Sequence, residues 1–200
     1  MCRRCARSGG AAPVWPEPVC RARTLVLVVG PSGAGKDSIL RRARDRLGPD
    51  APVRFARRVV TRPADEDENN EAATPEAFGA ARAAGAFALD WSAHGLHYGI
   101  PWRALDAMDP GAIVVVNGSR TVAARARALP ATVRIVLVTA PVSVLQARIL
   151  GRGREAEASA RLARDVGSIE DLRPDIVIDN SGSLDVAVDT FLDFLSEQQR

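Results

Sequence analysis

The chain has 200 residues, of which 46% are hydrophobic and 26% charged, a composition that fits one folded domain with a substantial core. It contains no apolar run near the length of about 18 residues that spans a bilayer, and residues 1–23 hold none of signal-peptide length, so we expect a cytoplasmic protein. The aromatic content of 4% is too low for a nucleic-acid-binding surface, whereas the mild net charge of +3 suits a protein that handles phosphates.

Residues 1–23 mix Arg, Gly and Pro and show no pattern of a core element. We interpret them as a disordered N-terminal extension before a single domain that spans residues 24–198. Two alternatives stay open: these residues could precede the true start, or they could form a transit peptide, although no amphipathic helix is evident.

All three cysteines, Cys2, Cys5 and Cys20, lie in this extension. Zinc takes four ligands, and the only histidines, His94 and His97, are far along the chain. We therefore interpret the cysteines as incidental thiols rather than as a metal site.

The first predicted elements surround a glycine-rich turn. Thr24–Val29 is a continuous apolar run, typical of a strand buried on both faces. Gly30–Gly35 is the turn, and Lys36–Leu47 carries apolar residues at helical spacing until Gly48-Pro49 ends the helix. Val53–Val60 is predicted as a second strand.

The middle of the chain departs from a simple alternation of strands and helices. Thr61–Thr74 is polar and acidic, and we predict a loop, after which Thr74 caps a helix that begins at Pro75 and ends near Ala84. Phe87–Tyr98 contains strand-like pieces broken at His94-Gly95, and Pro101–Met108 is predicted as a short helix. We interpret the segment from about residue 62 to residue 100 as an inserted substrate lobe.

The second half of the chain returns to alternation. The predicted strands are Ala112–Val116, Val133–Val138 and Asp175–Ile178, and the predicted helices are an Arg-rich one capped by Ser119, then Pro141–Leu150, Glu155–Asp165 and Leu184–Leu195. This order predicts an α/β fold with a parallel sheet covered by helices on both faces. Gly151–Arg154 (GRGR) is a basic, glycine-rich loop, and we predict that residues 151–158 form a lid.

The strongest functional signal is Gly30–Lys36 (GPSGAGK), which matches G-x-x-x-x-G-K between a predicted strand and a predicted helix, the context that this motif requires. The glycines let backbone N–H groups point at phosphate oxygens, and the helix adds its positive dipole end. Lys36 is the only lysine, and its ammonium suits the β- and γ-phosphates better than an incidental role in a glycine-rich turn. The predicted ATP-binding residues are Gly30, Pro31, Ser32, Gly33, Ala34, Gly35, Lys36, Asp37 and Ser38.

Asp37 stands where a Ser or Thr usually supplies a hydroxyl to Mg²⁺. Ser38 comes next, but one step along a helix turns a side chain by about 100°, so Ser38 does not take over that contact. Because hard cations prefer oxygen ligands, we predict that Asp37 binds Mg²⁺ directly. The alternative is that Asp37 only stabilises the positive end of the helix.

Arginines gather at predicted strand ends and in the glycine-rich loop, and phosphoryl transfer needs positive charge at such places. Three groups stand out: Arg57, Arg58 and Arg62 near the end of the second strand, Arg120 after a buried strand, and Arg148, Arg152 and Arg154 at the predicted lid. We predict that the lid group acts with Lys36 in catalysis. We interpret the acidic run Asp65–Glu68 as a solvated loop.

The chain from Leu25 to about Leu195 resembles the guanylate-kinase-like P-loop kinases. The segments that carry the resemblance are Gly30–Lys36, Val59–Pro63 (VVTRP), His97–Pro101 (HYGIP), and Gly151–Arg154 followed by Arg161-Leu162. The resemblance implies a three-layer parallel-sheet kinase fold with an inserted lobe and a lid. It also implies that Arg62 and Tyr98 grip a phosphate of the acceptor.

Departures from the guanylate kinase pattern indicate which family of these kinases the sequence resembles most. Ala64–Thr74 has no aromatic residue of the kind that holds GMP, and Asn117–Arg120 replaces an Asp-x-Asp. With Asp37 and Asn69-x-Glu71, these features resemble the ribose 1,5-bisphosphate phosphokinases of bacterial phosphonate breakdown. That resemblance implies transfer of the ATP γ-phosphoryl group to ribose 1,5-bisphosphate with Mg²⁺ as cofactor. The implied substrate-binding residues are Arg58, Arg62, Tyr98, Asn117, Arg120 and Arg161.

Two other functions stay open. A nucleoside monophosphate kinase would need base-reading groups, which Asn69, Asn70 and Glu71 could supply. A non-catalytic guanylate-kinase-like binding module would have no reason to keep an intact phosphate loop, Lys36 and a basic lid together. The expected partners are therefore ATP and a small phosphorylated sugar, without nucleic acid or membrane.

Overall fold

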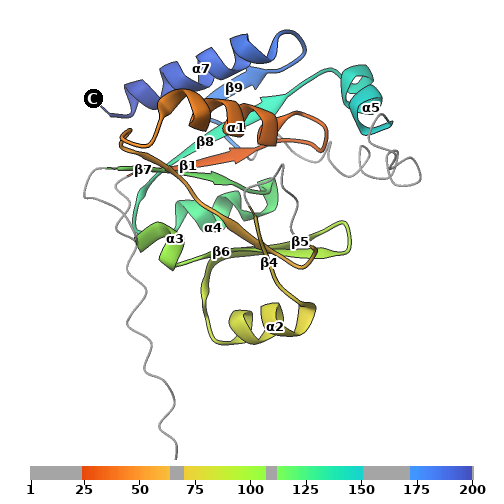
Figure 1. The fold of residues 1–200 in the computed structure, drawn as a ribbon, viewed down its shortest axis with the longest axis vertical. Coiled ribbons are helices and arrows are strands. Elements are labelled where there is room, and N and C mark those ends of the chain that lie inside the picture. The colour runs from red at the N-terminus through yellow and green to blue at the C-terminus, as the bar shows by residue number, and fades with distance from the viewer. Residues whose placement is uncertain (1–23, 64–69, 107–111, 151–171, 200) are drawn as a thin grey trace, which may run out of the picture.

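The main sheet has five parallel strands, in the order β2-β7-β1-β8-β9 (Figure 1). The computed structural model describes residues 24–63, 70–106, 112–150 and 172–199. The strands are β1 (Thr24–Val29), β2 (Val53–Phe55), β7 (Ile113–Asn117), β8 (Thr132–Thr139) and β9 (Ile176–Asp179). Every residue of β7, and all of β1 except Thr24, is buried, as a central strand covered on both faces requires.

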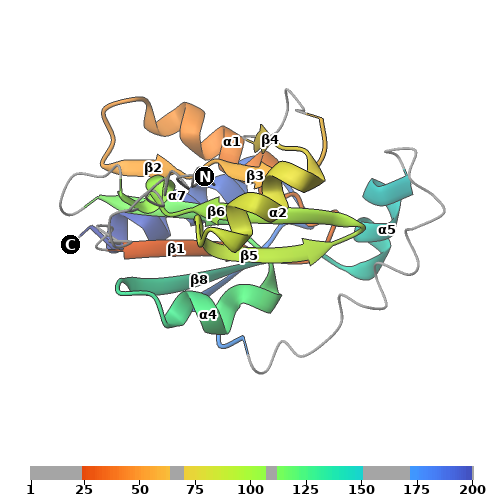
Figure 2. The ribbon, with the colours of Figure 1, turned by 90° about the horizontal axis from the view of Figure 1, so that it is seen from below.

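Helices cover both faces of this sheet and give the three layers expected from the sequence (Figures 1 and 2). α1 (Lys36–Leu47) and α7 (Leu184–Glu197) pack on one face, where Val26 and Val28 of β1 join a core cluster with Phe191. On the other face, Leu25 and Leu27 pack with the 3₁₀ turn η1 (Arg120–Val122), with α4 (Ala123–Arg127) and with α3 (Arg103–Asp106). Alternate β1 side chains therefore serve two separate cores.

α5 (Val142–Leu150) lies beyond the carboxyl end of β8 and buries Leu145 in the same cluster as α1 and α7. The predicted boundaries of β1 and α1 are confirmed residue for residue. None of the helices in the described ranges is long and apolar enough to cross a bilayer.

A second sheet of four strands lies below the main sheet in Figure 1, in the order β4-β3-β6-β5. Its strands are β3 (Arg58–Val60), β4 (Asn70–Ala72), β5 (Phe87–Ala93) and β6 (Leu96–Pro101). β5 and β6 form an antiparallel hairpin whose turn at His94-Gly95 has positive φ angles of 53° and 73°, at the break that the sequence predicts.

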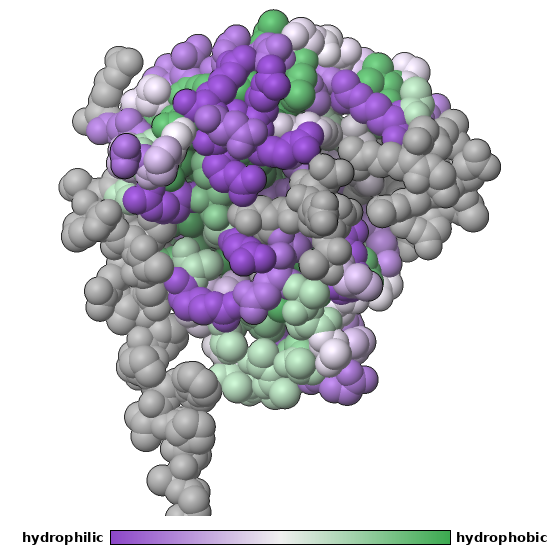
Figure 3. Space-filling model, in the orientation of Figure 1, coloured by the Kyte–Doolittle hydropathy of each residue, from purple (hydrophilic) through white to green (hydrophobic). Residues whose placement is uncertain are grey.

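α2 (Pro75–Ala83) packs on the second sheet, and the Phe78 ring stacks on the Phe87 ring at 4.7 Å. The predicted start is confirmed, since the Thr74 hydroxyl accepts a hydrogen bond from the Ala77 N–H and Pro75 is the first helical residue. The alanines of α2 give this part of the surface its weakly hydrophobic colour in Figure 3.

The prediction of one strand over Val53–Val60 is wrong, because this segment forms β2 in the main sheet and β3 in the second sheet. β2 follows β7 only as far as the bond from the Ala56 N–H to the Val115 carbonyl. The chain then crosses through Arg57, and β3 pairs with β4 and β6. A local pattern carries no information on where a partner strand ends.

Two other predictions need correction. Asn70–Ala72 belongs to β4, not to a loop, because its backbone pairs in parallel with β3. The helix predicted over Pro101–Met108 is only Arg103–Asp106 in the described residues, because Pro101 ends β6. The predictions for residues 151–171 lie outside the described residues.

Candidate active site

The phosphate loop joins β1 to α1 and is packed tightly against its neighbours. Gly30 has φ 152°, and a Cβ there would lie 2.0 Å from the Val138 carbonyl oxygen of β8. Gly35 has φ 87°, and a Cβ there would lie 2.3 Å from Nδ2 of Asn180. At these two positions glycine is required by both the backbone angle and the lack of space.

The Lys36 side chain folds back along the loop. Its Nζ donates to the carbonyl oxygens of Gly30, at 2.7 Å, and Pro31, at 3.0 Å. These contacts hold an ammonium group at the loop, whose glycines and helix N-terminus are suited to phosphate. The geometry agrees with the ATP-binding prediction for Gly30–Ser38, which stays a prediction.

Asn180 joins three elements at the loop and was not among the predicted site residues. Its side-chain Nδ2 donates to the Ala34 carbonyl oxygen at 2.8 Å, and its backbone carbonyl oxygen accepts from Nη2 of Arg148 at 2.9 Å. The residue is 3% exposed. A sequence signal existed, because Asn180 directly follows β9 and Asn117 ends β7, so both lie at the carboxyl ends of strands of the main sheet.

Arg148 of α5 reaches the same place. Its second nitrogen, Nη1, is buried and has no hydrogen-bond partner among the residues that the structure describes. It lies 3.9 Å from the position of a Cβ on Gly35. A buried guanidinium N–H without a partner is costly, and an anionic oxygen at the loop would satisfy it. The predicted residues Arg152, Arg154 and Arg161 lie outside the described residues.

A second polar cluster joins α1 to the second sheet. Oδ1 of Asp37 accepts hydrogen bonds from Nδ2 of Asn117, at 2.6 Å, and from Nη2 of Arg58, at 3.2 Å. Nε of Arg58 donates to Oδ1 of Asn70 at 3.0 Å, and the guanidinium carbon lies 5.9 Å from the centre of the Tyr98 ring. The structure thus brings together the predicted residues Asp37, Arg58, Tyr98 and Asn117, and we call Asp37, Arg58, Asn70 and Asn117 the junction cluster.

The two lobe segments that carry the family resemblance are neighbours in space. Val60 of β3 pairs with Tyr98 of β6, and Oγ1 of Thr61 accepts a hydrogen bond from the His97 N–H at 2.9 Å. Arg62 follows directly after this contact. Arg120 begins η1 just after β7, close in the chain to Asn117. Their predicted roles toward the acceptor stay predictions.

Asp37 has the chemistry of a magnesium ligand. Its Oδ1 is engaged by two donors, but within the described parts of the chain Oδ2 has no partner, and the side chain is 41% exposed. Mg²⁺ in kinases is commonly held by one or two carboxylates together with substrate phosphates. One open carboxylate oxygen beside a phosphate loop fits that donor set.

The Asn117 amide has a further feature. Its Oδ1 is buried and without a hydrogen-bond partner among the described residues, while its Nδ2 is held by Asp37. The orphan oxygen is therefore an acceptor that a ligand hydroxyl could satisfy.

Comparisons with known proteins were made with the sequence and with the fold. No protein-family model matches the chain. The chain is 48% identical over 178 residues to the ribose 1,5-bisphosphate phosphokinase PhnN of Acidiphilium cryptum, covering 88% of this chain and 93% of that protein. It is 48% identical over 160 residues to the protein of that name from Rhodopseudomonas palustris, covering 79% and 80%.

Among solved structures, the guanylate kinase of Anaplasma phagocytophilum matches with a TM-score of 0.63 at 17% identity, covering 91% of this chain and 89% of that one. This likeness confirms the guanylate-kinase-like fold, and the sequence relatives show that the protein is a kinase. The chain belongs to the family of ribose 1,5-bisphosphate phosphokinases.

Proposed function

We propose that the protein transfers the γ-phosphoryl group of ATP to ribose 1,5-bisphosphate in phosphonate breakdown. An oxygen of the acceptor's 1-phosphate forms a bond to the γ-phosphorus as the bond to the β–γ bridging oxygen breaks. The products are 5-phosphoribosyl 1-diphosphate and ADP. The main support for this proposal is the junction cluster, because it places the guanidinium group of Arg58 where the phosphate loop meets the second sheet.

The ATP half of the site uses the loop between β1 and α1. Backbone N–H groups and the N-terminus of α1 bind the phosphates, and Lys36 and Arg148 balance charge on the moving group. Asp37 would hold Mg²⁺ through Oδ2, and the bound ion would neutralise charge on the β- and γ-phosphates.

The acceptor half suits a phosphorylated sugar. Arg58 and Arg62 offer guanidinium groups to its phosphates, and the orphan Oδ1 of Asn117 can accept a hydrogen bond from a ribose hydroxyl. The attacking oxygen already belongs to a phosphate, so no general base is needed. Positioning and charge neutralisation are sufficient for this transfer.

A nucleoside monophosphate kinase is the second candidate. Two of its three candidate base-reading residues, Asn70 and Glu71, are engaged elsewhere, and Asn69 lies outside the described residues. Oδ1 of Asn70 accepts from Arg58, and Oε2 of Glu71 is paired with Arg103. Neither group is free to read a purine without breaking a contact. The contacts therefore favour the sugar bisphosphate over GMP.

The test is an acceptor screen with ATP and Mg²⁺. Ribose 1,5-bisphosphate, GMP and AMP are supplied separately, and the products are separated by ion-exchange chromatography and identified by mass. We expect 5-phosphoribosyl 1-diphosphate from the sugar and little product from either nucleotide. Efficient phosphorylation of GMP, with none of the sugar bisphosphate, would assign the protein to the rival function.

A further inference from the structure

We infer that Asp37 also acts on the acceptor through Arg58: it pairs with Arg58 until Mg²⁺ and ATP bind, and thereby couples the loading of Mg²⁺ and ATP to acceptor binding. This inference rests on the proposed function and adds a second role to the residue assigned to the metal.

The contact between Asp37 and Arg58 connects two parts of the fold that belong to different sheets. Asp37 lies in the first turn of α1, directly after Lys36, and Arg58 begins β3 in the second sheet. Their 3.2 Å ion pair therefore ties the ATP loop to the acceptor lobe. A change in charge at the Asp37 carboxylate therefore changes the electrostatic interaction with the Arg58 guanidinium.

The two partners differ in exposure. The Arg58 side chain is 11% exposed and is held by Asn70 and by the face of the Tyr98 ring as well as by Asp37. The Asp37 side chain is 41% exposed, so a cation can reach its carboxylate. A cation from solvent therefore reaches Asp37 first. Arg58 is the less exposed partner, and its interactions change when the charge on Asp37 is neutralised.

The response follows from Coulomb's law. A divalent cation at the Asp37 carboxylate neutralises it and repels the guanidinium of Arg58 nearby. Arg58 then gains more from an anionic phosphate of the acceptor than it does when Asp37 alone is present. Metal–nucleotide and acceptor binding consequently strengthen each other, and by thermodynamic linkage the factor is the same in both directions.

A purely metal-binding Asp37 predicts something different. Removing its charge would then weaken catalysis but leave the affinity for acceptor in the absence of nucleotide unchanged. If Asp37 competes with the acceptor for Arg58, Asp37→Asn should bind the acceptor more tightly in buffer alone. The substitution keeps the size of the side chain and an oxygen for the Asn117 bond.

The experiment is calorimetric titration of the full chain with ribose 1,5-bisphosphate. Each protein is titrated in buffer, with Mg²⁺ alone, and with Mg²⁺ and a non-hydrolysable ATP analogue. The matched control is Asp45→Asn, which removes an exposed carboxylate from the same helix. In the wild type and the control, we expect the metal–nucleotide to tighten acceptor binding by about 5- to 150-fold.

For Asp37→Asn we expect tighter binding than wild type in buffer and little further gain from the metal–nucleotide. In steady-state assays its kcat should fall without a rise in the KM for acceptor, and thermal melts check folding. A second variant, Asp37→Ser, restores a metal-ligating hydroxyl but no charge. It should recover part of kcat while the coupling stays absent.

The outcomes separate this inference from the function on which it rests. If the wild type binds the sugar bisphosphate equally well in all three conditions, or if Asp37→Asn matches it in buffer, the coupling is wrong and the function stands. If coupling returns in Asp37→Ser, the metal alone produces it and the ion pair does not. If the wild type binds no sugar bisphosphate under any condition, the proposed function fails.

Discussion

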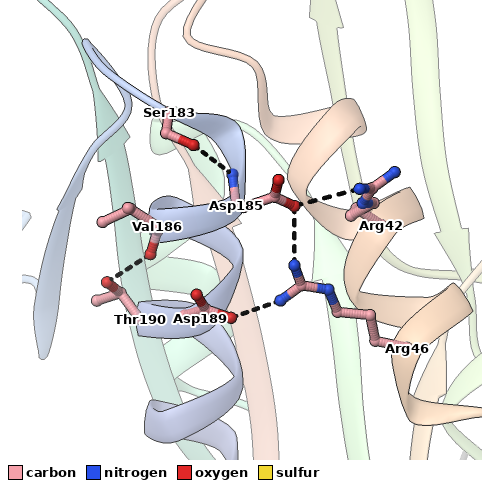
Figure 4. A network of polar contacts seen from close by, with 7 residues as sticks. All are labelled: Arg42, Arg46, Ser183, Asp185, Val186, Asp189 and Thr190. Carbon is pink, nitrogen blue, oxygen red and sulfur yellow. Dashed lines mark hydrogen bonds and ion pairs between the residues drawn. The ribbon is translucent and has the colours of Figure 1, made fainter.

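Two clusters of arginine and aspartate side chains involve α1, and they differ in where they lie. On the outer surface, Arg42 and Arg46 of α1 pair with Asp185 and Asp189 of α7 (Figure 4). We call these four residues the surface cluster. At the other cluster, Asp37 pairs with Arg58 at the junction of the two sheets.

The two clusters differ in the exposure of their side chains, and we expect different roles for them. Arg42, Asp185 and Asp189 are 53–63% exposed, so water and salt screen their attraction, and such pairs contribute about 0–1 kcal/mol each to stability. Arg58 is 11% exposed and has exchanged hydration for fixed partners. A charge in that environment acts strongly on any phosphate that reaches it. The same type of arginine–aspartate pair therefore joins α1 to α7 at the surface, and at the junction of the two sheets it belongs to the candidate active site.

The largest effect is expected at Lys36, on the site side of the comparison. Lys36→Ala should lower turnover by at least about a hundredfold, since removal of one preorganised charge donor typically costs that much. Lys36→Arg should also lose most turnover, because a planar fork does not replace a compact ammonium. Turnover is measured with thermal melts as the control, and near-wild-type turnover in Lys36→Ala would contradict the kinase site described for this loop.

Arg58→Ala tests the junction cluster directly. We expect the KM for the sugar bisphosphate to rise by at least about tenfold, because a charge-assisted bond to an anion contributes roughly 1.5–3 kcal/mol. Arg46→Ala is the matched control, since it removes the same side chain from the surface cluster. Initial rates at varied acceptor concentration give the KM of each variant. Equal effects on KM in the two variants would show that the comparison is mistaken.

Asn180→Ala should lower the free energy of unfolding by about 1–3 kcal/mol, since it leaves the buried Ala34 carbonyl oxygen without its side-chain donor. Urea denaturation measures the change. Ser181→Ala, at the neighbouring exposed position, serves as the control. We also expect lower turnover from Asn180→Ala, because this contact fixes the loop. An unfolding free energy equal to that of wild type would mean that the loop is held by other contacts.

The smallest effect is expected at the surface cluster. Arg46→Ala should cost no more than about 1 kcal/mol in unfolding free energy and should leave kcat unchanged. The loss should shrink further in 1 M salt, where the Debye length is only about 3 Å. A larger loss that salt does not reduce would place this cluster in the same class as the junction cluster.

Local rules predicted the elements whose limits are local. α1 ends at Leu47 because Gly48 follows it, and α2 begins at Pro75 because Thr74 caps it. The split of Val53–Val60 was not predictable, since it depends on where β7 stops offering hydrogen bonds. Pairing across the fold is a tertiary property that a single stretch of sequence does not encode.

The same limit applies to the site. The phosphate loop was predictable because its residues are consecutive, and Asp37 was noticeable because it departs from a known pattern. Arg58 and Asn117 were also predicted as site residues, but their contacts with Asp37 were not, since they lie 21 and 80 positions away in the chain. Asn180 lies 146 positions from Ala34 and was missed, although its place just after a predicted strand was a usable signal.

The crossing at Ala56-Arg57 has a consequence for evolution. The two sheets share no strand, so the hydrogen-bonded frame of the ATP half is complete without the lobe. With the acceptor bound at the lobe, as we propose, mutations in the lobe could alter which acceptor is held without changing the main sheet. The fold itself is shared with a guanylate kinase at only 17% sequence identity. For protein engineers, a replacement lobe would need both a partner for Asp37 and apolar residues that pack on the main sheet, as Leu89 and Ile100 do.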